Sequence, residues 1–439
     1  MIKEHLKNVS LVYIIIPLVL TIIGVIFIFS TGINPDGTNS GQFIRQLIWI
    51  AIGLGLAVLV LSIDYYQLVE TSEYYYIAGI VFLIFTLLFG RVIRGSRSWL
   101  GYGGMGIQPS EIMKIFFILM FAKFLGKAPE KEKSLRTFLI SLALIAVPLG
   151  LILIQPDLGT SIVFIVVFIV MCVMGINKIK YSVYLLSVAG VTGFMVLTRA
   201  YYEFHYIEHG GLPMDFLTIL FSFEAMVGIA ITMFIIAAIA FVIDLFRPLE
   251  IINKILPIPL VIGISFAVSA VSIKLLKPYQ WRRLLVFLNP EFDRWGAGYN
   301  IIQSKIAVGS GGFLGKGLFR GTQNTLGFLP EKNTDFIFSI ISEELGFLGS
   351  GLIILLFLVY FYFIIRLIKE AKDKEGKLVA SGILAMYFTH FAVNVGMTLG
   401  IAPVTGLPLP FISYGGSSFL ACIIGASLLA NIHSRRFVH

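Results

Sequence analysis

Long apolar runs separated by short polar segments dominate this chain of 439 residues. A bilayer-spanning α-helix needs about 20 apolar residues, and the runs approach that length. They lack the alternation of apolar and polar positions that an outer-membrane barrel requires, so we expect helices. The pattern predicts twelve membrane-spanning helices, near residues 11–31, 46–63, 74–90, 109–126, 138–154, 160–175, 181–198, 225–245, 253–276, 345–368, 378–400 and 413–431.

Composition supports the same class of protein. Hydrophobic residues make up 58% of the chain and charged residues 13%, and the mean hydropathy is +0.93. These values exclude a soluble enzyme, a disordered scaffold, a collagen-like fibre and a disulfide-stapled secreted domain. Cys172 and Cys422 lie inside apolar runs and carry no redox inference. We predict one all-α polytopic membrane domain over residues 1–439.

The net charge of +9 comes from basic residues between the runs, where they first report topology. We therefore predict no nucleic-acid partner. Lys and Arg are in excess in the segments on the same side as the N-terminus, which places both termini in the cytoplasm and residues 277–344 outside. The first run lacks a small-residue cleavage site after it, so we expect it to be retained as a helix.

One short outer loop departs from this charge rule. It holds Arg91, Arg94 and Arg97, whereas the neighbouring inner loop is acidic. A local deviation of the topology signal is one explanation. The other is that arginines kept outside bind an anionic group, such as a lipid pyrophosphate, through charge-assisted hydrogen bonds.

Ionisable residues inside apolar runs are functional candidates by default. Glu111 and Lys114 lie three residues apart on the helix that begins at Pro109, so they share one face. One interpretation is that the two form a structural ion pair. The other is that Lys114 directs its positive charge toward a substrate phosphate. Asp157 either caps the helix that follows it or has a functional role. His390 is predicted to be a packed, hydrogen-bonded core residue.

The outer segment 277–344 mixes aromatic, acidic and basic residues, and nine glycines fall between Gly296 and Gly327. This composition is typical of a site where backbone approaches a large polar ligand. A phosphate-binding loop at 310–317 is excluded, because Ser310 and Gly317 replace residues that the motif requires. His205 and His209 lack a further anchoring ligand, so we predict no metal site.

Five stretches, in order along the chain, resemble the signature segments of the SEDS proteins, the RodA/FtsW family. Within the family, 321–323 and 328–332 resemble the elongation-type RodA branch more than the division-type FtsW branch. The stretches are QPSEIMK (108–114), QPDLGTS (155–161), NPEFDRWGAGYNIIQS (289–304), GTQNTLGFLPEKNTDFIFSIISEE (321–344) and PVTGLPLPFISYGGSS (403–418).

The resemblance implies an inverting peptidoglycan glycosyltransferase that polymerises lipid II at the outer face of the bacterial cytoplasmic membrane during cell elongation. It implies lipid II and undecaprenyl-pyrophosphate-linked glycan as ligands. It also implies a class B penicillin-binding protein and other membrane proteins of the elongation complex as partners. No cofactor is specified, and a divalent cation remains an open alternative.

Carried over by position, the family's essential outer aspartate is Asp293 and its helix lysine is Lys114. We expect Asp293 to be the catalytic base, in surroundings beside Trp295 or lipid that raise its basicity. The family's pattern is not matched at Ser98, where many members have a basic residue, or at Asn333, where His is usual. The residues expected to bind substrate are Arg97, Lys114, Glu111, Gln303, Lys305, Lys332, Asp335, Glu343 and Glu344.

The family has ten spans, two fewer than the pattern here. A single added helix would move Asp293 to the cytoplasm, so we predict an inserted pair that includes residues 199–252, before the catalytic loop 277–344. Two other functions remain open. A flippase or transporter for a lipid-linked precursor would concentrate polar residues at the bilayer midplane, and a non-enzymatic scaffold would not need Asp293.

Overall fold

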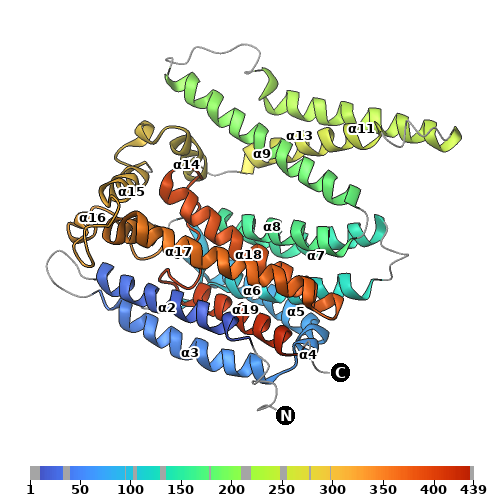
Figure 1. Cartoon of the computed structure of the whole chain (residues 1–439). Helices are drawn as coiled ribbons and strands as arrows, with labels where there is room; N and C mark the ends of the chain where they lie inside the picture. The colour runs from blue at the N-terminus through green and yellow to red at the C-terminus, as the bar shows by residue number, and fades with distance from the viewer. Residues whose placement is uncertain are drawn as a thin grey trace. The chain divides into compact units, whose positions relative to one another are not determined.

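The apolar runs form α-helices in the computed structural model (Figure 1). Lipid offers no hydrogen-bond partner, so each run pairs its backbone groups within its own helix. Eleven helices among the described residues are long and apolar enough to cross a membrane. At the remaining expected position lies α6 (Pro109–Lys127), which carries Glu111, Lys114 and Lys123. The structure describes residues 10–32, 40–93, 95–101, 106–128, 135–176, 179–208, 219–247, 255–275, 278–296 and 298–435.

The chain is therefore an all-α multi-pass membrane protein, as the sequence predicts, and the total of twelve spans stays a prediction. It divides into two compact units, which are described separately. Unit 1 comprises Met1–Asn177 and Tyr299–His439, and unit 2 comprises Lys178–Gly298. The predicted insertion 199–252 lies within unit 2, and the predicted outer segment 277–344 is divided between the units after Gly298.

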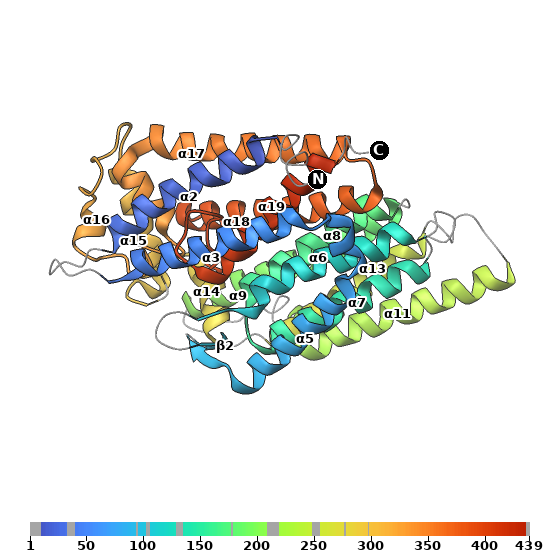
Figure 2. The same ribbon diagram turned by 90° about the horizontal axis from the view of Figure 1, so that it is seen from below.

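Unit 1 is a helical bundle with one short β-hairpin. Its most buried spans are α18, which packs against α6, α8 and α17, and α19, which packs against α2, α3 and α6 (Figures 1 and 2). Besides α6, its elements are α2 (Val12–Thr31), α3 (Gln42–Ser62), α4 (Tyr65–Glu70), α5 (Ser72–Phe89), β1 (Arg91–Ile93), β2 (Ser96–Trp99), α7 (Leu135–Ile154), α8 (Leu158–Gly175), α15 (Tyr299–Ser310), α16 (Thr322–Thr325), α17 (Ile337–Glu370), α18 (Lys374–Leu399) and α19 (Gly416–Arg435).

Buried aromatic rings join the central helices of unit 1. Tyr360 of α17 and Tyr387 of α18 stack with their ring centroids 6.0 Å apart, and Phe357 and Phe391 approach to 4.8 Å. The hydroxyl of Tyr387 donates to the carbonyl of Cys422 in α19 at 2.6 Å. A buried tyrosine thus contributes apolar area and still satisfies its polar end. These contacts fix α17, α18 and α19 as one core.

The acidic segment next to the arginine-containing loop, with Asp64, Glu70 and Glu73, is compensated by basic residues from other helices. Each acidic side chain forms an ion pair with a residue of α6 or α19, so the loop is not an isolated negative patch. A count of charges loop by loop does not detect such pairs. They are Asp64–Arg435 at 2.7 Å, Glu70–Lys127 at 2.6 Å and Glu73–Lys123 at 3.0 Å.

Helix α17 is interrupted at Gly346, whose φ of 66° and ψ of −162° are incompatible with a helix. The break leaves carbonyl groups of the preceding turn without helical partners. The loop after α15 supplies them, because the N–H groups of Lys316 and Gly317 donate to the carbonyls of Glu343 and Glu344 at 3.0 Å each. The loop is thereby attached to the start of α17.

Unit 2 contains three long helices where the sequence predicts spans near 181–198, 225–245 and 253–276. Helix α11 packs against α13, and α13 packs against α9 (Figure 1). A small core of Met195, Phe221, Met226 and Ala270 holds them together. The elements are α9 (Ile179–Glu208), α11 (Phe223–Phe246), α13 (Pro257–Leu275), α14 (Pro278–Leu288) and the 3₁₀ turn η2 (Pro290–Asp293).

We predict that the added helices cross the membrane as a pair. A cysteine at position 207 should then react with an impermeant reagent from outside, and one at position 250 from the cytoplasm, because Arg247 and Lys254 favour an inner turn. The background is the variant with both native cysteines, which are buried, replaced by alanine. Labelling of position 207 from the cytoplasm, or of position 250 from outside, would refute the pair.

Candidate functional site

Asp293 ends the 3₁₀ turn η2, which directly follows α14. The side chain of Asn289 begins the turn by accepting the N–H of Glu291 at 3.0 Å. The carbonyl of Asp293 then accepts the N–H groups of Gly296 at 3.1 Å and Gly298 at 3.0 Å. The backbone therefore folds tightly around this half-buried aspartate.

The turn leaves little space at the two glycines after Asp293. A Cβ atom at Gly296 would lie 2.4 Å from both carboxylate oxygens of Asp293, and one at Gly298 would lie 2.1 Å from the carbonyl of Pro290. Trp295 is 87% exposed, so its indole does not bury the carboxylate within unit 2. Burial of Asp293 by lipid stays a prediction.

Lys114 lies between two buried partners in unit 1. Its Nζ atom is 2.9 Å from Oε1 of Glu111 and 2.8 Å from Nε2 of His390 in α18. The exposed fractions are 2% for Lys114, 4% for Glu111 and 2% for His390. The Glu111–Lys114 ion pair is therefore present, and His390 is confirmed as a buried, hydrogen-bonded residue. Binding of a substrate phosphate by Lys114 stays a prediction.

Asp157 caps α8, which confirms the structural interpretation of this residue. Its Oδ1 accepts the N–H of Thr160 at 3.1 Å, and its Oδ2 accepts the Thr160 hydroxyl at 2.8 Å. The amide of Gln108 also donates to Oδ2 at 2.6 Å. Asp157 thus ties the start of α6 to the start of α8.

Arg97 is presented on the β-hairpin, in which β1 and β2 pair antiparallel. The hydroxyl of Ser96 anchors the hairpin by donating to the carbonyl of Gln155 at 2.6 Å. The Arg97 side chain is exposed, and its guanidinium donates a long hydrogen bond to the carbonyl of Leu87 at 3.4 Å. Its guanidinium is therefore accessible to an anion. Arg94, predicted to act with it, lies outside the described residues.

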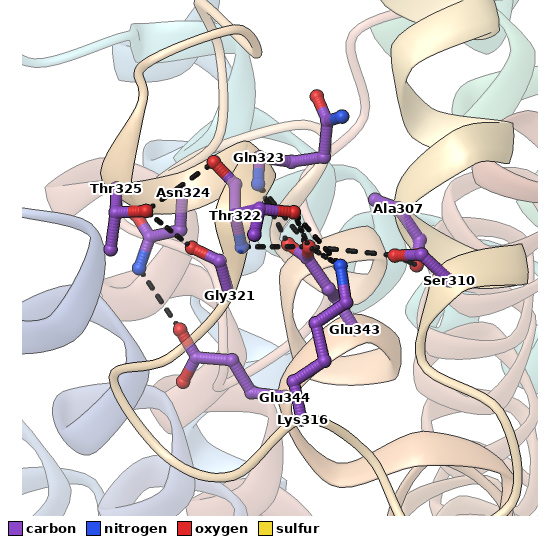
Figure 3. A network of polar contacts seen from close by, with 10 residues as sticks. All are labelled: Ala307, Ser310, Lys316, Gly321, Thr322, Gln323, Asn324, Thr325, Glu343 and Glu344. Carbon is purple, nitrogen blue, oxygen red and sulfur yellow. Dashed lines mark hydrogen bonds and ion pairs between the residues drawn. The ribbon is translucent and has the colours of Figure 1, made fainter.

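Glu343 is fully buried, and protein donors replace the water around its carboxylate (Figure 3). Oε1 accepts hydrogen bonds from the ammonium of Lys316 at 2.7 Å and from both the N–H and the hydroxyl of Thr322 at 2.8 Å. The N–H of Gln323 lies 3.2 Å from each carboxylate oxygen. The charge of Glu343 thus holds the glycine-rich loop against α17.

Glu344 is fully buried beside it and holds the next part of the same loop. Its Oε1 accepts the Asn324 amide and the Ser30 hydroxyl, both at 3.0 Å, and its Oε2 accepts the N–H of Phe319 at 3.0 Å. Lys332 donates to the backbone carbonyl and side-chain oxygen of Asn324 at 2.8 and 2.9 Å. Burial lowers the pKa of Lys332, and Glu344 opposes that shift.

These internal contacts favour a role for Glu343, Glu344 and Lys332 in shaping the loop. Direct contact of the three with substrate, which the resemblance implies, stays a prediction. Their network also includes Lys316, Thr322, Asn324 and Ser30, which the sequence does not predict as site residues. Thr322 and Asn324 lie in a signature segment, but the linear pattern shows no partner for any of the four, because each acquires its partner through the fold.

The other expected substrate contacts lie elsewhere in unit 1. Lys305 of α15 is exposed. Its side chain packs against Gly400, where a Cβ atom would lie 2.1 Å from the lysine Cε. Gln303 of the same helix is half-buried. Asp335 accepts the side-chain amide of Asn394 through its backbone carbonyl at 2.9 Å.

The two departures from the family pattern are accommodated by internal hydrogen bonds. Asn333 donates its side-chain amide to Gln42 of α3, and Ser98 is buried and bonded to Ser96 at 3.0 Å. Among the residues that the structure describes, no three His, Cys, Asp or Glu side chains gather as a metal site. His209, part of the rejected metal pattern, lies outside these residues.

Fold and site define a polytopic membrane protein with a carboxylate on a tight turn outside its spanning helices and a compensated lysine inside its bundle. The chain belongs to the FtsW/RodA/SpoVE family, whose model, described as a cell cycle protein, matches residues 10–209 and 212–437. The resemblance inferred from the signature segments is therefore confirmed.

Curated relatives match the chain over nearly its whole length. The peptidoglycan glycosyltransferase RodA of Treponema pallidum is 38% identical, covering 95% of this chain and 96% of the relative. The peptidoglycan glycosyltransferase MrdB of Escherichia coli K12 is 32% identical, covering 96% and 94%. A chain in a solved structure of a peptidoglycan synthase complex, which coordinates polymerization and crosslinking, is 25% identical with a TM-score of 0.66, covering 98% and 99%.

Glu343 should contribute strongly to stability. Glu343→Ala removes an ion pair and leaves buried N–H groups of the loop unpaired, so we expect the free energy of unfolding to fall by about 3–5 kcal/mol. The control is Glu370→Ala in the same helix, whose exposed pair with Arg366 should be worth about 0.3–0.5 kcal/mol. Thermal unfolding in detergent measures both. Equal losses in the two variants would contradict the role assigned to Glu343.

Proposed function

We propose that this chain is a peptidoglycan glycosyltransferase that polymerises lipid II at the outer face of the bacterial cytoplasmic membrane during cell elongation. The observation that carries the proposal is the turn that presents Asp293, in a chain that aligns over 95% of its length with a relative named for this activity. Both termini then lie in the cytoplasm, as the distribution of Lys and Arg indicates.

In this reaction a sugar hydroxyl attacks the anomeric carbon of a lipid-linked disaccharide while the pyrophosphate leaves. A single displacement inverts the anomeric configuration and needs one base beside the attacking hydroxyl. Asp293 is suited to that role, because it lies on a short, closed turn whose backbone approaches closely at Gly296 and Gly298. The base accepts the hydroxyl proton as the new glycosidic bond forms.

The leaving pyrophosphate needs positive charge where its own negative charge develops. Arg97 offers an exposed guanidinium, which can bind two phosphate oxygens at once. Lys114 offers an ammonium that Glu111 and His390 already hold by hydrogen bonds. Gln303, Lys305 and Asp335 are proposed as contacts to the sugar and peptide groups of the substrate, and Glu111, Lys332, Glu343 and Glu344 as residues that shape these contacts.

A class B penicillin-binding protein is the proposed crosslinking partner, together with other membrane proteins of the elongation complex. The match to a chain from a complex that coordinates polymerization and crosslinking supports this assignment. Association of the two activities would bring a new glycan strand directly to the enzyme that crosslinks it.

Asp293→Asn should lower polymerisation of purified lipid II by about 10²-fold to 10⁴-fold, because it removes the general base and little packing. Gly296→Ala should also lower the rate, because it retains the carboxylate but displaces it. The matched control is Glu291→Gln, which neutralises an exposed carboxylate of the same turn. Normal glycan synthesis by well-folded Asp293→Asn protein would refute the assignment.

Arg97→Ala and Lys114→Ala should each slow turnover at limiting lipid II by about 10²-fold, as loss of a charge-stabilising donor does elsewhere. The control for Lys114 is Lys123→Ala at the other end of α6, where the lysine pairs with Glu73. A second variant, Glu111→Gln with Lys114→Met, avoids an uncompensated buried charge. If both arginine and lysine variants kept normal rates, Lys114 would be only a structural partner of Glu111.

A further inference from the structure

His390 connects Lys114 to a segment that is distant in sequence. Lys114 and His390 are 276 residues apart, yet Nζ and Nε2 approach to 2.8 Å in the buried core of unit 1. A buried imidazole needs a hydrogen-bond partner at each nitrogen, and Lys114 is the partner at Nε2.

The hydrogen-bond partners determine which nitrogen of His390 carries the proton. Nδ1 lies 3.0 Å from the backbone carbonyl of Pro408, a group that can only accept. Nδ1 must therefore be the N–H donor. Nε2 faces the ammonium of Lys114, a group that can only donate, so it must be the unprotonated acceptor. The geometry requires the neutral imidazole with its proton on Nδ1.

The same geometry fixes the ammonium of Lys114. An ammonium has three N–H donors in a tetrahedral arrangement. Glu111 accepts one at 2.9 Å and His390 accepts another at 2.8 Å. Together with the Cε–Nζ bond, these two acceptors fix the position of the nitrogen and the direction of its third N–H. With Glu111 alone, the flexible lysine side chain could keep the ion pair in other rotamers, which would aim its remaining N–H groups elsewhere.

The segment that His390 holds is short of its own donors. The stretch 403–410 includes Pro403, Pro408 and Pro410, which have no N–H to donate, and α18 supplies the partners of two of its carbonyls, those of Leu407 and Pro408. One turn after His390, Asn394 donates to the carbonyl of Leu407 at 2.7 Å. His390 thus lies at a junction with two separable contacts, one to this segment and one to Lys114.

We propose that His390 is a positioning residue, which orients the third N–H of Lys114 toward the leaving pyrophosphate. This assignment rests on the function proposed above. His390 does not touch the reacting atoms and acts through Lys114. Glu111 compensates the charge of the lysine, and His390 sets its direction.

Two amide substitutions separate the two contacts of His390. The side-chain amide of Gln reaches the position of Nε2, so His390→Gln can still accept from Lys114. The shorter amide of Asn reaches the position of Nδ1, so His390→Asn can still donate to Pro408 but cannot reach Lys114. A role limited to holding the 403–410 segment predicts that Asn is tolerated and Gln is not. The positioning role predicts the opposite order.

The test is lipid II polymerisation by the purified full-length variants, with kcat and KM determined separately. We expect His390→Asn to lower kcat by about 10-fold to 100-fold, as small misplacements of a catalytic group do, with a smaller change in KM. His390→Gln should retain most of the wild-type kcat. In the Lys114→Ala background, His390→Asn should cause no further loss. Additive losses, or a larger loss for Gln than for Asn, would overturn the proposal.

A second measurement does not depend on catalysis. Binding of undecaprenyl pyrophosphate to the detergent-solubilised variants should weaken several-fold in His390→Asn, whereas adding His390→Asn to Lys114→Ala should weaken it no further. Thermal unfolding identifies variants that have lost the fold. If the wild type makes no glycan, the proposed function fails, and the binding cycle still decides whether His390 acts through Lys114. Independent effects on binding would refute that link.

Discussion

A charged side chain inside an apolar bundle retains its charge only where protein groups replace the water that it has lost. This constraint governs the interior of unit 1. Lys114 is enclosed by a carboxylate and an imidazole, and Glu343 by an ammonium, a hydroxyl and backbone N–H groups. Each cluster ties together helices or loops that are distant in sequence. The charges therefore specify which segments meet, in a protein whose helices are otherwise similar apolar rods.

The same constraint explains why irregular backbone occurs within this fold. Non-helical segments at membrane depth are tolerated only where their polar groups find partners in the protein. At Gly346 the partners come from the loop after α15, and at 403–410 they come from His390 and Asn394 of α18. Both irregular segments are hydrogen-bonded to residues that are proposed to act in the mechanism or to shape the site. Stability and geometry of the site thus arise from the same hydrogen bonds.

Much of the helical fold could be predicted from the sequence, because each span is a run of consecutive, mostly apolar residues. Local pairs were also accessible: Asp157 caps the helix that follows it, and Glu111 and Lys114 share one helical face. Contacts between distant residues were not. The linear pattern identifies His390 as buried but carries no sign of Lys114, and it shows neither the bond of Ser30 to Glu344 nor the pair of Asp64 with Arg435, 371 residues away. Such partners are defined only when the helices pack.

The proposed function requires the Asp293 carboxylate to serve glycan polymerisation. The most direct measurement supplies purified lipid II to proteoliposomes that contain the purified chain, with and without a cognate penicillin-binding protein, and separates the products by length. The account predicts glycan strands of many disaccharides with inverted linkages, formed from lipid II on the leaflet that faces residues 277–344. Transfer of intact lipid II across the bilayer without any polymer, in the presence of the partner, would contradict it and favour a flippase.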